Sequence, residues 1–147
     1  MKRKILFTLL VVSLAIVAIG CASAALFDNE NKVTIDGIDF NVPDGYKEDT
    51  NYQTINEVKN KGGVQYTVNG KVFEKGSDIV SILVSDYGEY KLTDDIVKSV
   101  GGDEKTIGDV KGYASEDDGY YLFTYIKDDK LVVFSVTGED SIEGFLK

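Results

Sequence analysis

The clearest hydrophobic pattern lies in residues 119–137, where two apolar runs flank a polar break at Asp128 and Asp129. Two runs rich in β-branched and aromatic residues, separated by two polar residues, predict a β-hairpin. Both faces of this hairpin carry apolar side chains, which is typical of a hairpin at the centre of a sheet that is covered on both sides. The expected cross-strand pairs are Phe123 with Phe134, Tyr125 with Val132, and Tyr121 with Val136.

The preceding half of the chain also alternates between apolar and polar positions. Val33–Pro43 predicts a hairpin with its turn at Asp36 and Gly37. Val64–Phe73 predicts a second hairpin that turns at Asn69 and Gly70, because Asn-Gly is the strongest short-range turn signal. Further elements expected here are a buried strand over Ile79–Val84, a long polar loop over Lys47–Gly63 and a short loop over Tyr87–Tyr90.

Two short segments have helical signals. Thr93 precedes two acids and an apolar stripe that stops at Gly101-Gly102, which predicts a short helix with Thr93 as its N-cap. Asp140–Glu143 matches a capping box and predicts a short C-terminal helix. With strands over Lys105–Ser115, the order predicts an α+β fold with a mostly antiparallel sheet of about six or seven strands and two short helices.

The N-terminus has the pattern of an export signal or a membrane anchor. Three cations, Lys2, Arg3 and Lys4, precede a run without any charge that extends from Ile5 to Phe27. We therefore divide the chain into a signal peptide or anchor (1–27), a linker (28–32) and an extracytoplasmic domain (33–147).

Three fates of this segment stay open. Ala18–Cys21 resembles a lipobox, which would place a lipid on Cys21 after cleavage before it. Ala22–Ala24 fits ordinary signal cleavage and free secretion. An uncleaved run of this length can span a bilayer, with Lys2–Lys4 in the cytoplasm. All three place the domain outside the cytoplasm, and the first and third hold it at the cell membrane.

Composition restricts the chemistry. All 25 acidic residues lie after Phe27, so the domain is strongly acidic and unsuited to a phosphate backbone, which argues against a nucleic-acid partner. The chain has no histidine, and Cys21 is its one cysteine. The domain therefore offers no imidazole base and no histidine or cysteine metal ligand, and no cofactor is indicated.

Acidic residues are the remaining chemical candidates. The best cation-binding stretch is Glu116, Asp117 and Asp118, although it lacks the alternating spacing that wraps a calcium ion. Recurrent acidic pairs also leave open a hydrolase that acts on a cell-surface polymer through two carboxylates. No nucleophile turn or phosphate-binding glycine motif is present, and we expect no catalytic residue.

The order of elements resembles a known family. Phe40–Tyr46, Val110–Tyr113, the long hairpin and the terminal helix resemble Mog1/PsbP-like domains, and Lys105–Glu143 is similar to short uncharacterised exported proteins of methanogenic archaea. The resemblance implies an α/β/α sandwich that acts as a binding or assembly module. No functional residue is carried over, because the matching positions are turn and core residues.

These observations give one leading functional expectation and two alternatives. We expect a membrane-tethered extracytoplasmic binding or assembly module without catalytic activity, which presents loops to a protein or cell-surface partner. The alternatives are the carboxylate hydrolase and an acidic cation-binding envelope protein. An exposed tyrosine or apolar patch would favour the module, and two carboxyl groups across a cleft would favour the hydrolase.

Overall fold

The computed structural model describes residues 31–146, without the side chains of residues 100 and 101. The expected anchor and Cys21 lie outside these residues. The elements in chain order are β1 (Lys32–Ile35), β2 (Ile38–Asn41), β3 (Lys47–Glu48), η1 (Thr50–Tyr52), β4 (Thr54–Lys61), β5 (Val64–Lys75), β6 (Asp78–Asp86), α2 (Asp94–Gly101), β7 (Asp103–Ile107), β8 (Val110–Asp117), β9 (Tyr120–Lys127), β10 (Lys130–Val136), η2 (Glu139–Ser141) and α3 (Ile142–Leu146).

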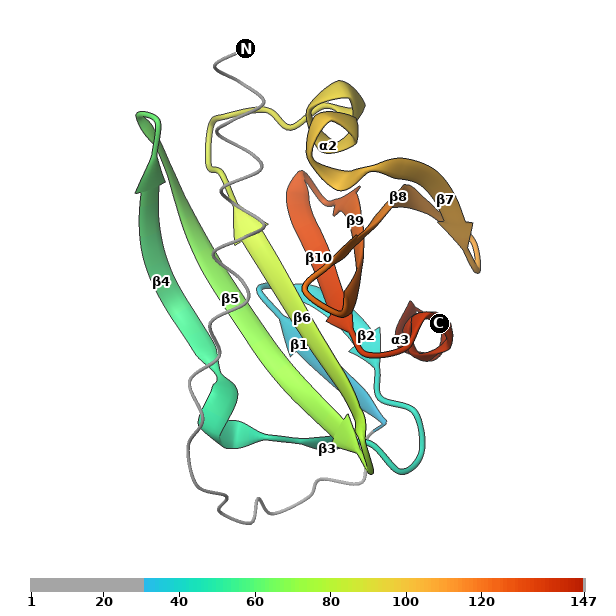
Figure 1. Cartoon of the computed structure of the whole chain (residues 1–147). Helices are drawn as coiled ribbons and strands as arrows, with labels where there is room; N and C mark the ends of the chain where they lie inside the picture. The colour runs from blue at the N-terminus through green and yellow to red at the C-terminus, as the bar shows by residue number, and fades with distance from the viewer. Residues whose placement is uncertain (1–30, 147) are drawn as a thin grey trace.

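One antiparallel sheet of eight strands dominates the fold (Figure 1). Its order is β3-β5-β6-β10-β9-β8-β7. β4 also pairs with β5: β3 lies opposite Phe73 and Glu74 near the end of β5, and β4 lies opposite its earlier residues. β1 and β2 form a separate two-stranded sheet. The expected α+β class with a mostly antiparallel sheet and two short helices is confirmed.

The hairpin of β9 and β10 lies inside this sheet as predicted. Phe123 is opposite Phe134, and the two other expected pairs are also present. Asp128 and Asp129 form the turn with φ of 51° and 60°, a left-handed conformation that suits a two-residue hairpin loop. β10 hydrogen-bonds to β6 on its other side, so the hairpin is central.

Each face of the sheet has its own hydrophobic core. On one face the β1–β2 hairpin and α3 cover β6, β9 and β10, with Phe134 and Phe145 fully buried. On the other face α2 packs its buried Val97 against Leu131 and Val133 of β10. β10 therefore contributes buried side chains to both cores, which explains why its apolar run is continuous.

The expected loop over Lys47–Gly63 is wrong. This stretch forms β3, η1 and the eight-residue strand β4, and Gly62 and Gly63 make the turn into β5 with φ of 59° and 83°. β4 lies at the sheet edge, where most of its side chains are exposed. An edge strand in water on both faces needs no apolar alternation, so its sequence lacks the usual strand pattern. The sheet accordingly has more strands than the six or seven expected.

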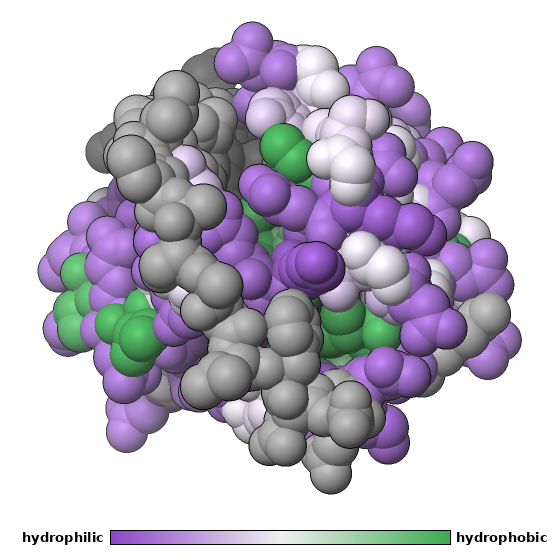
Figure 2. All heavy atoms as spheres, turned by 90° about the horizontal axis from the view of Figure 1, so that it is seen from below, coloured by the Kyte–Doolittle hydropathy of each residue, from purple (hydrophilic) through white to green (hydrophobic). Residues whose placement is uncertain are grey.

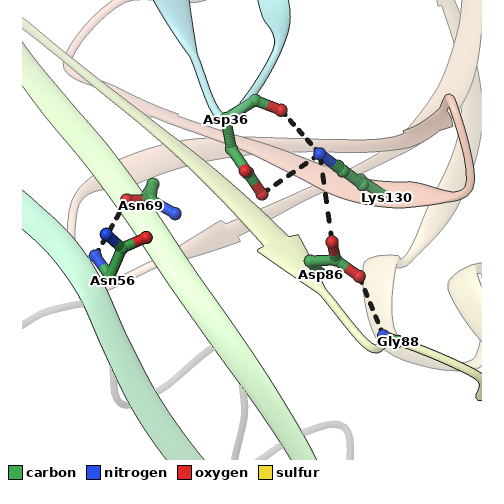
Figure 3. Close-up of polar contacts among 6 residues, drawn as sticks. All are labelled: Asp36, Asn56, Asn69, Asp86, Gly88 and Lys130. Carbon is green, nitrogen blue, oxygen red and sulfur yellow. Dashed lines mark hydrogen bonds and ion pairs between the residues drawn. The ribbon is translucent and has the colours of Figure 1, made fainter.

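The expected turn at Asn69 and Gly70 is also wrong, because β5 continues through both residues for twelve residues. The Asn69 side chain accepts a hydrogen bond from the backbone N–H of Asn56, 2.8 Å away, at a bulge of β4 (Figure 3). A Cβ on Gly70 would overlap the Leu83 side chain in β6. Asn69 thus stabilises the bulge of β4, and Gly70 leaves room for the Leu83 side chain of the adjacent strand.

The remaining local predictions hold with one change. Asp36 and Gly37 form the β1–β2 turn, and the Thr93 hydroxyl caps α2 by accepting from the Ile96 N–H. The C-terminal helix begins differently from the expected capping box. The chain first makes the 3-10 turn η2 after Gly138, without a side-chain cap, and then continues into α3.

Candidate binding surface

An open hollow lies at one end of the large sheet, between the start of β5 and the loop that follows β6. Its volume is about 550 Å³, and its lining residues belong to two short segments. We call it the tyrosine hollow; it is lined by Gly63–Thr67 and by Asp86–Tyr90. Because it is shallow and open to solvent, it suits the docking of a side chain or a short segment rather than the enclosure of a small substrate.

Local hydrogen bonds fix the loop after β6. The Asp86 carboxylate accepts the Gly88 N–H at 2.8 Å, which turns the chain directly after the strand. The Tyr90 N–H donates to the Tyr87 carbonyl at 3.1 Å and closes a tight turn. Gly88 has a φ of 58°, a conformation that glycine adopts without strain. The loop predicted over Tyr87–Tyr90 is therefore present and has a defined shape.

Three tyrosines line the hollow at different depths. Tyr66 and Tyr87 are buried, and their rings stack with centroids 4.9 Å apart. Tyr90 is 39 % exposed and is among the few large apolar side chains of residues 31–146 that face the solvent. The buried pair forms a rigid floor, and Tyr90 offers a ring and a hydroxyl at the rim.

The hollow is neutral at its floor and acidic at its rim. Burial raises the pKa of the Tyr87 phenol, and burial together with the charge of Glu57 raises the pKa of Tyr66, so both phenols stay protonated at neutral pH. Asp86 and Glu89 add carboxylates to the lining. Aromatic rings beside carboxylates favour a ligand with a cationic or amphipathic group.

The Lys130 side chain connects the loop of the hollow to the β1–β2 turn. Lys130 Nζ, at the start of β10, lies 3.9 Å from a carboxylate oxygen of Asp86 and 3.3 Å from one of Asp36 in the β1–β2 turn (Figure 3). The Asp86 carboxylate thus links the Gly88 N–H to Lys130. The loop of the hollow and the β1–β2 hairpin are held by one connected set of polar contacts.

The candidate acids lie elsewhere. Glu116 and Asp117 end β8 opposite Tyr121 and Tyr120, and all three candidate acids are exposed. Asp118 lies in the following turn with a φ of 49°. Within residues 31–146, no group of three or more Asp, Glu, His or Cys residues gathers into a possible metal site.

The sequence pointed to part of the hollow. The short loop expected over Tyr87–Tyr90 forms one side of the lining. Tyr66 was missed because it occupies the middle of an expected strand, and only the pairing of Thr67 with Asp86 places β5 beside the loop. Tyr113 belongs to the core under α2, and Tyr121 packs against the other core.

In the described part of the chain, no helix is both long and apolar enough to cross a bilayer. The expected anchor (1–27) and the lipidation candidate Cys21 lie outside that part. A scan against protein-family models, a search of curated proteins and a search of solved structures each found no match for this chain.

Proposed function

We propose that this chain is a membrane-tethered extracytoplasmic binding or assembly module of Mog1/PsbP-like type, without catalytic activity of its own. The tyrosine hollow is the observation that carries this proposal. It combines a rigid stacked pair, Tyr66 and Tyr87, with an exposed ring at Tyr90, and such aromatic groups are enriched where proteins bind proteins.

The surrounding sheet supports this role. The hollow lies at the adjoining ends of β5 and β6, which pair over nine residues in continuous register, and its loop over Tyr87–Tyr90 is fixed by hydrogen bonds directly after β6. Sites on packed strands keep their geometry better than sites on free loops, so little ordering is needed when a partner binds. The acidic rim, with Asp86 and Glu89, favours a partner segment that presents lysine, arginine or an aromatic residue.

Photo-cross-linking in native membranes tests the binding surface. A photoreactive amino acid replaces Tyr90 in the full chain, and a matched variant carries it at Tyr120, at the start of β9 and the opposite end of the sheet. We expect a discrete adduct from position 90 alone, and we expect excess wild-type protein to suppress it. Excess of a Glu89→Lys variant should suppress it less. Adducts of equal yield at both positions, or none at position 90, would overturn the proposal.

Intact mass of the protein from native membranes tests the tether separately. A mass beginning at Cys21 with added lipid, or an unprocessed mass from Met1, supports attachment to the membrane. A mass beginning at Ala25 means free secretion and rejects the tether while leaving the binding surface in place. Release of soluble fragments from cell-envelope polymer by the purified protein would favour the hydrolase instead.

A further inference from the structure

The outer edge of β4 is the largest unpaired strand edge beside the hollow. β4 hydrogen-bonds to β5 along one side, and no strand of residues 31–146 pairs with its other side. It also carries two strongly exposed apolar side chains, Ile55 at 69 % and Val58 at 60 %. Figure 2 shows apolar residues standing among hydrophilic ones on the side where Figure 1 places β4. Exposed edges of this kind are templates for further strand pairing.

We propose that this edge pairs with β4 of a second copy of the chain, antiparallel and centred on Val58, so that two sheets join into one. The charges on either side of Val58 indicate that the partner strand is β4 of a second copy. Glu57 and Lys59 flank Val58, so in this register each Glu57 lies opposite Lys59 of the second copy, once on each side of the axis. Opposite charges directly across a strand pair are stabilising.

Symmetry allows few other registers. A two-fold axis between identical antiparallel strands is perpendicular to the sheet, so both copies keep the same face on the same side. Opposed residues must then share a face, so the axis lies midway between one residue and the same residue of the second copy. We name each axis by that residue. An axis at Lys59 opposes Lys59 to itself, and one at Glu57 opposes Glu57 to itself. An axis at Asn60 opposes Lys59 to Lys61. An axis at Thr54, Ile55 or Asn56 falls on the irregular part of β4. Among the residues of the regular segment Glu57–Lys61, the Val58 axis alone avoids like charges across the pair.

The observed contacts within one chain favour this arrangement. Glu57 and Lys59 lie opposite Val68 and Tyr66, and therefore on the face of α2, and their charged groups are 3.4 Å apart. Their side chains are 54 % and 31 % exposed, so they are available to a neighbour. In the pair, two such ion pairs form a square of alternating charge, while the Val58 side chains meet on the other face.

The bulge in β4 limits the pairing to a short segment. The register with β5 shifts between Thr54 and Glu57, and Asn56 has a φ of 48°. Regular pairing about Val58 therefore covers Glu57–Lys59, because Asn60 would lie opposite the bulge residue Asn56 of the second copy. A pairing this short brings the charged pairs together but does not support open-ended sheet growth. We expect a dimer that stops at two copies, because the pairing consumes the β4 edge of both.

The same symmetry fits the proposed tether, and this one point rests on the proposed function. The β1–β2 hairpin packs on the face opposite α2, and the described chain enters there at Lys32. Because both copies present the same face to the same side, both N-termini leave toward one side. Both anchors can then enter a single membrane.

Sedimentation of the full chain in non-ionic detergent, combined with a charge swap, tests the pairing without depending on the tether. We expect a reversible dimer whose Kd rises about tenfold or more in Glu57→Lys and in Lys59→Glu, since each places two like-charged pairs across the axis. The double variant E57K/K59E restores opposite charges and should return the Kd to within about threefold of wild type. Circular dichroism confirms that each variant is folded.

A monomeric wild type at all concentrations would overturn the proposal and assign the β4 edge to another partner. A double variant as weak as the single ones would reject the register. As a second readout, Val58→Cys should form a disulfide-linked dimer in membranes beyond the wild-type background from Cys21. Directly opposed strand residues have the Cα spacing that a disulfide needs. The matched control is Thr106→Cys, exposed on the opposite edge strand β7; equal cross-linking there would also count against the pairing.

Discussion

The ammonium group of Lys130 lies 2.6 Å from the carbonyl oxygen of Asp36, a residue 94 positions earlier in the chain. It also lies 3.3 Å from the Asp36 carboxylate, so one side chain contacts both the backbone and the side chain of the β1–β2 turn. Lys130 thereby fastens a two-stranded sheet, which has no strand pairing with the large sheet, to the start of β10.

Replacing Lys130 with methionine should lower the free energy of unfolding by about 1–2 kcal/mol, because a partly buried hydrogen bond to a charged group is lost. Thermal or urea denaturation measures the change. Lys127→Met is the matched control, since Lys127 is the cross-strand neighbour of Lys130 and is exposed. Equal stability losses in the two variants would contradict a specific anchoring role.

Adding a methyl group at Gly112 should lower stability by about 1–3 kcal/mol, because overpacking a rigid site forces backbone shifts. A Cβ there would lie 2.6 Å from the Thr124 carbonyl oxygen and 2.8 Å from the ring of the fully buried Phe123. Gly138→Ala is the control, since its nearest neighbour is 3.8 Å away and its φ of −141° suits alanine. Urea midpoints of both variants check the difference.

Asn69→Ala should loosen β4 and lower stability by about 1 kcal/mol, because the Asn56 N–H at the bulge loses its acceptor. Amide hydrogen exchange should become faster in β4 while β10 stays protected. Asn60→Ala removes an exposed amide from the same edge strand and should leave exchange unchanged. A uniform loss of protection in both variants would show that the bulge is not the cause.

Alkaline pH should unfold the protein through its buried tyrosines. Burial raises the pKa of Tyr125 well above the ordinary value of 10.0. Its contribution to stability is complete below about pH 10 and is lost as the pH rises further, because only the unfolded chain then releases the proton. One such group gives a slope of about 1.4 kcal/mol per pH unit. In urea titrations above pH 10, Tyr125→Phe should show a shallower decline than wild type; an unchanged slope would refute this assignment.

The sequence predicts the centre of the fold well, for a physical reason. In β9 and β10 the apolar residues, the two-aspartate turn and the pairing of Phe123 with Phe134 all require the same register. Where burial, local propensity and turn chemistry agree, a hairpin can be assigned without knowledge of its neighbours.

The edge of the sheet was misread because its determinants are tertiary. Both faces of β4 are exposed to solvent, so its side chains need not alternate between apolar and polar, and the sequence carries no strand pattern there. Asn69 and Gly70 have strong turn propensity, but the space beside Leu83 and the donor at Asn56 decide their role. Likewise Tyr66 joins the tyrosine hollow only through the pairing of β5 with β6, which a local pattern does not encode.

The separate β1–β2 sheet has a mechanical consequence. β1 hydrogen-bonds to β2 alone, and Lys32 and Asn41 pair at the open end of the hairpin. A force applied to the N-terminal end of β1 therefore loads the backbone hydrogen bonds of the hairpin one after another, starting with the bond from the Val42 N–H to the Asn31 carbonyl, instead of shearing them together. The hairpin should yield first and lengthen the chain while the eight-stranded sheet stays intact. Under the proposed membrane tether, this hairpin would unfold before the surface that we propose for a partner is disturbed.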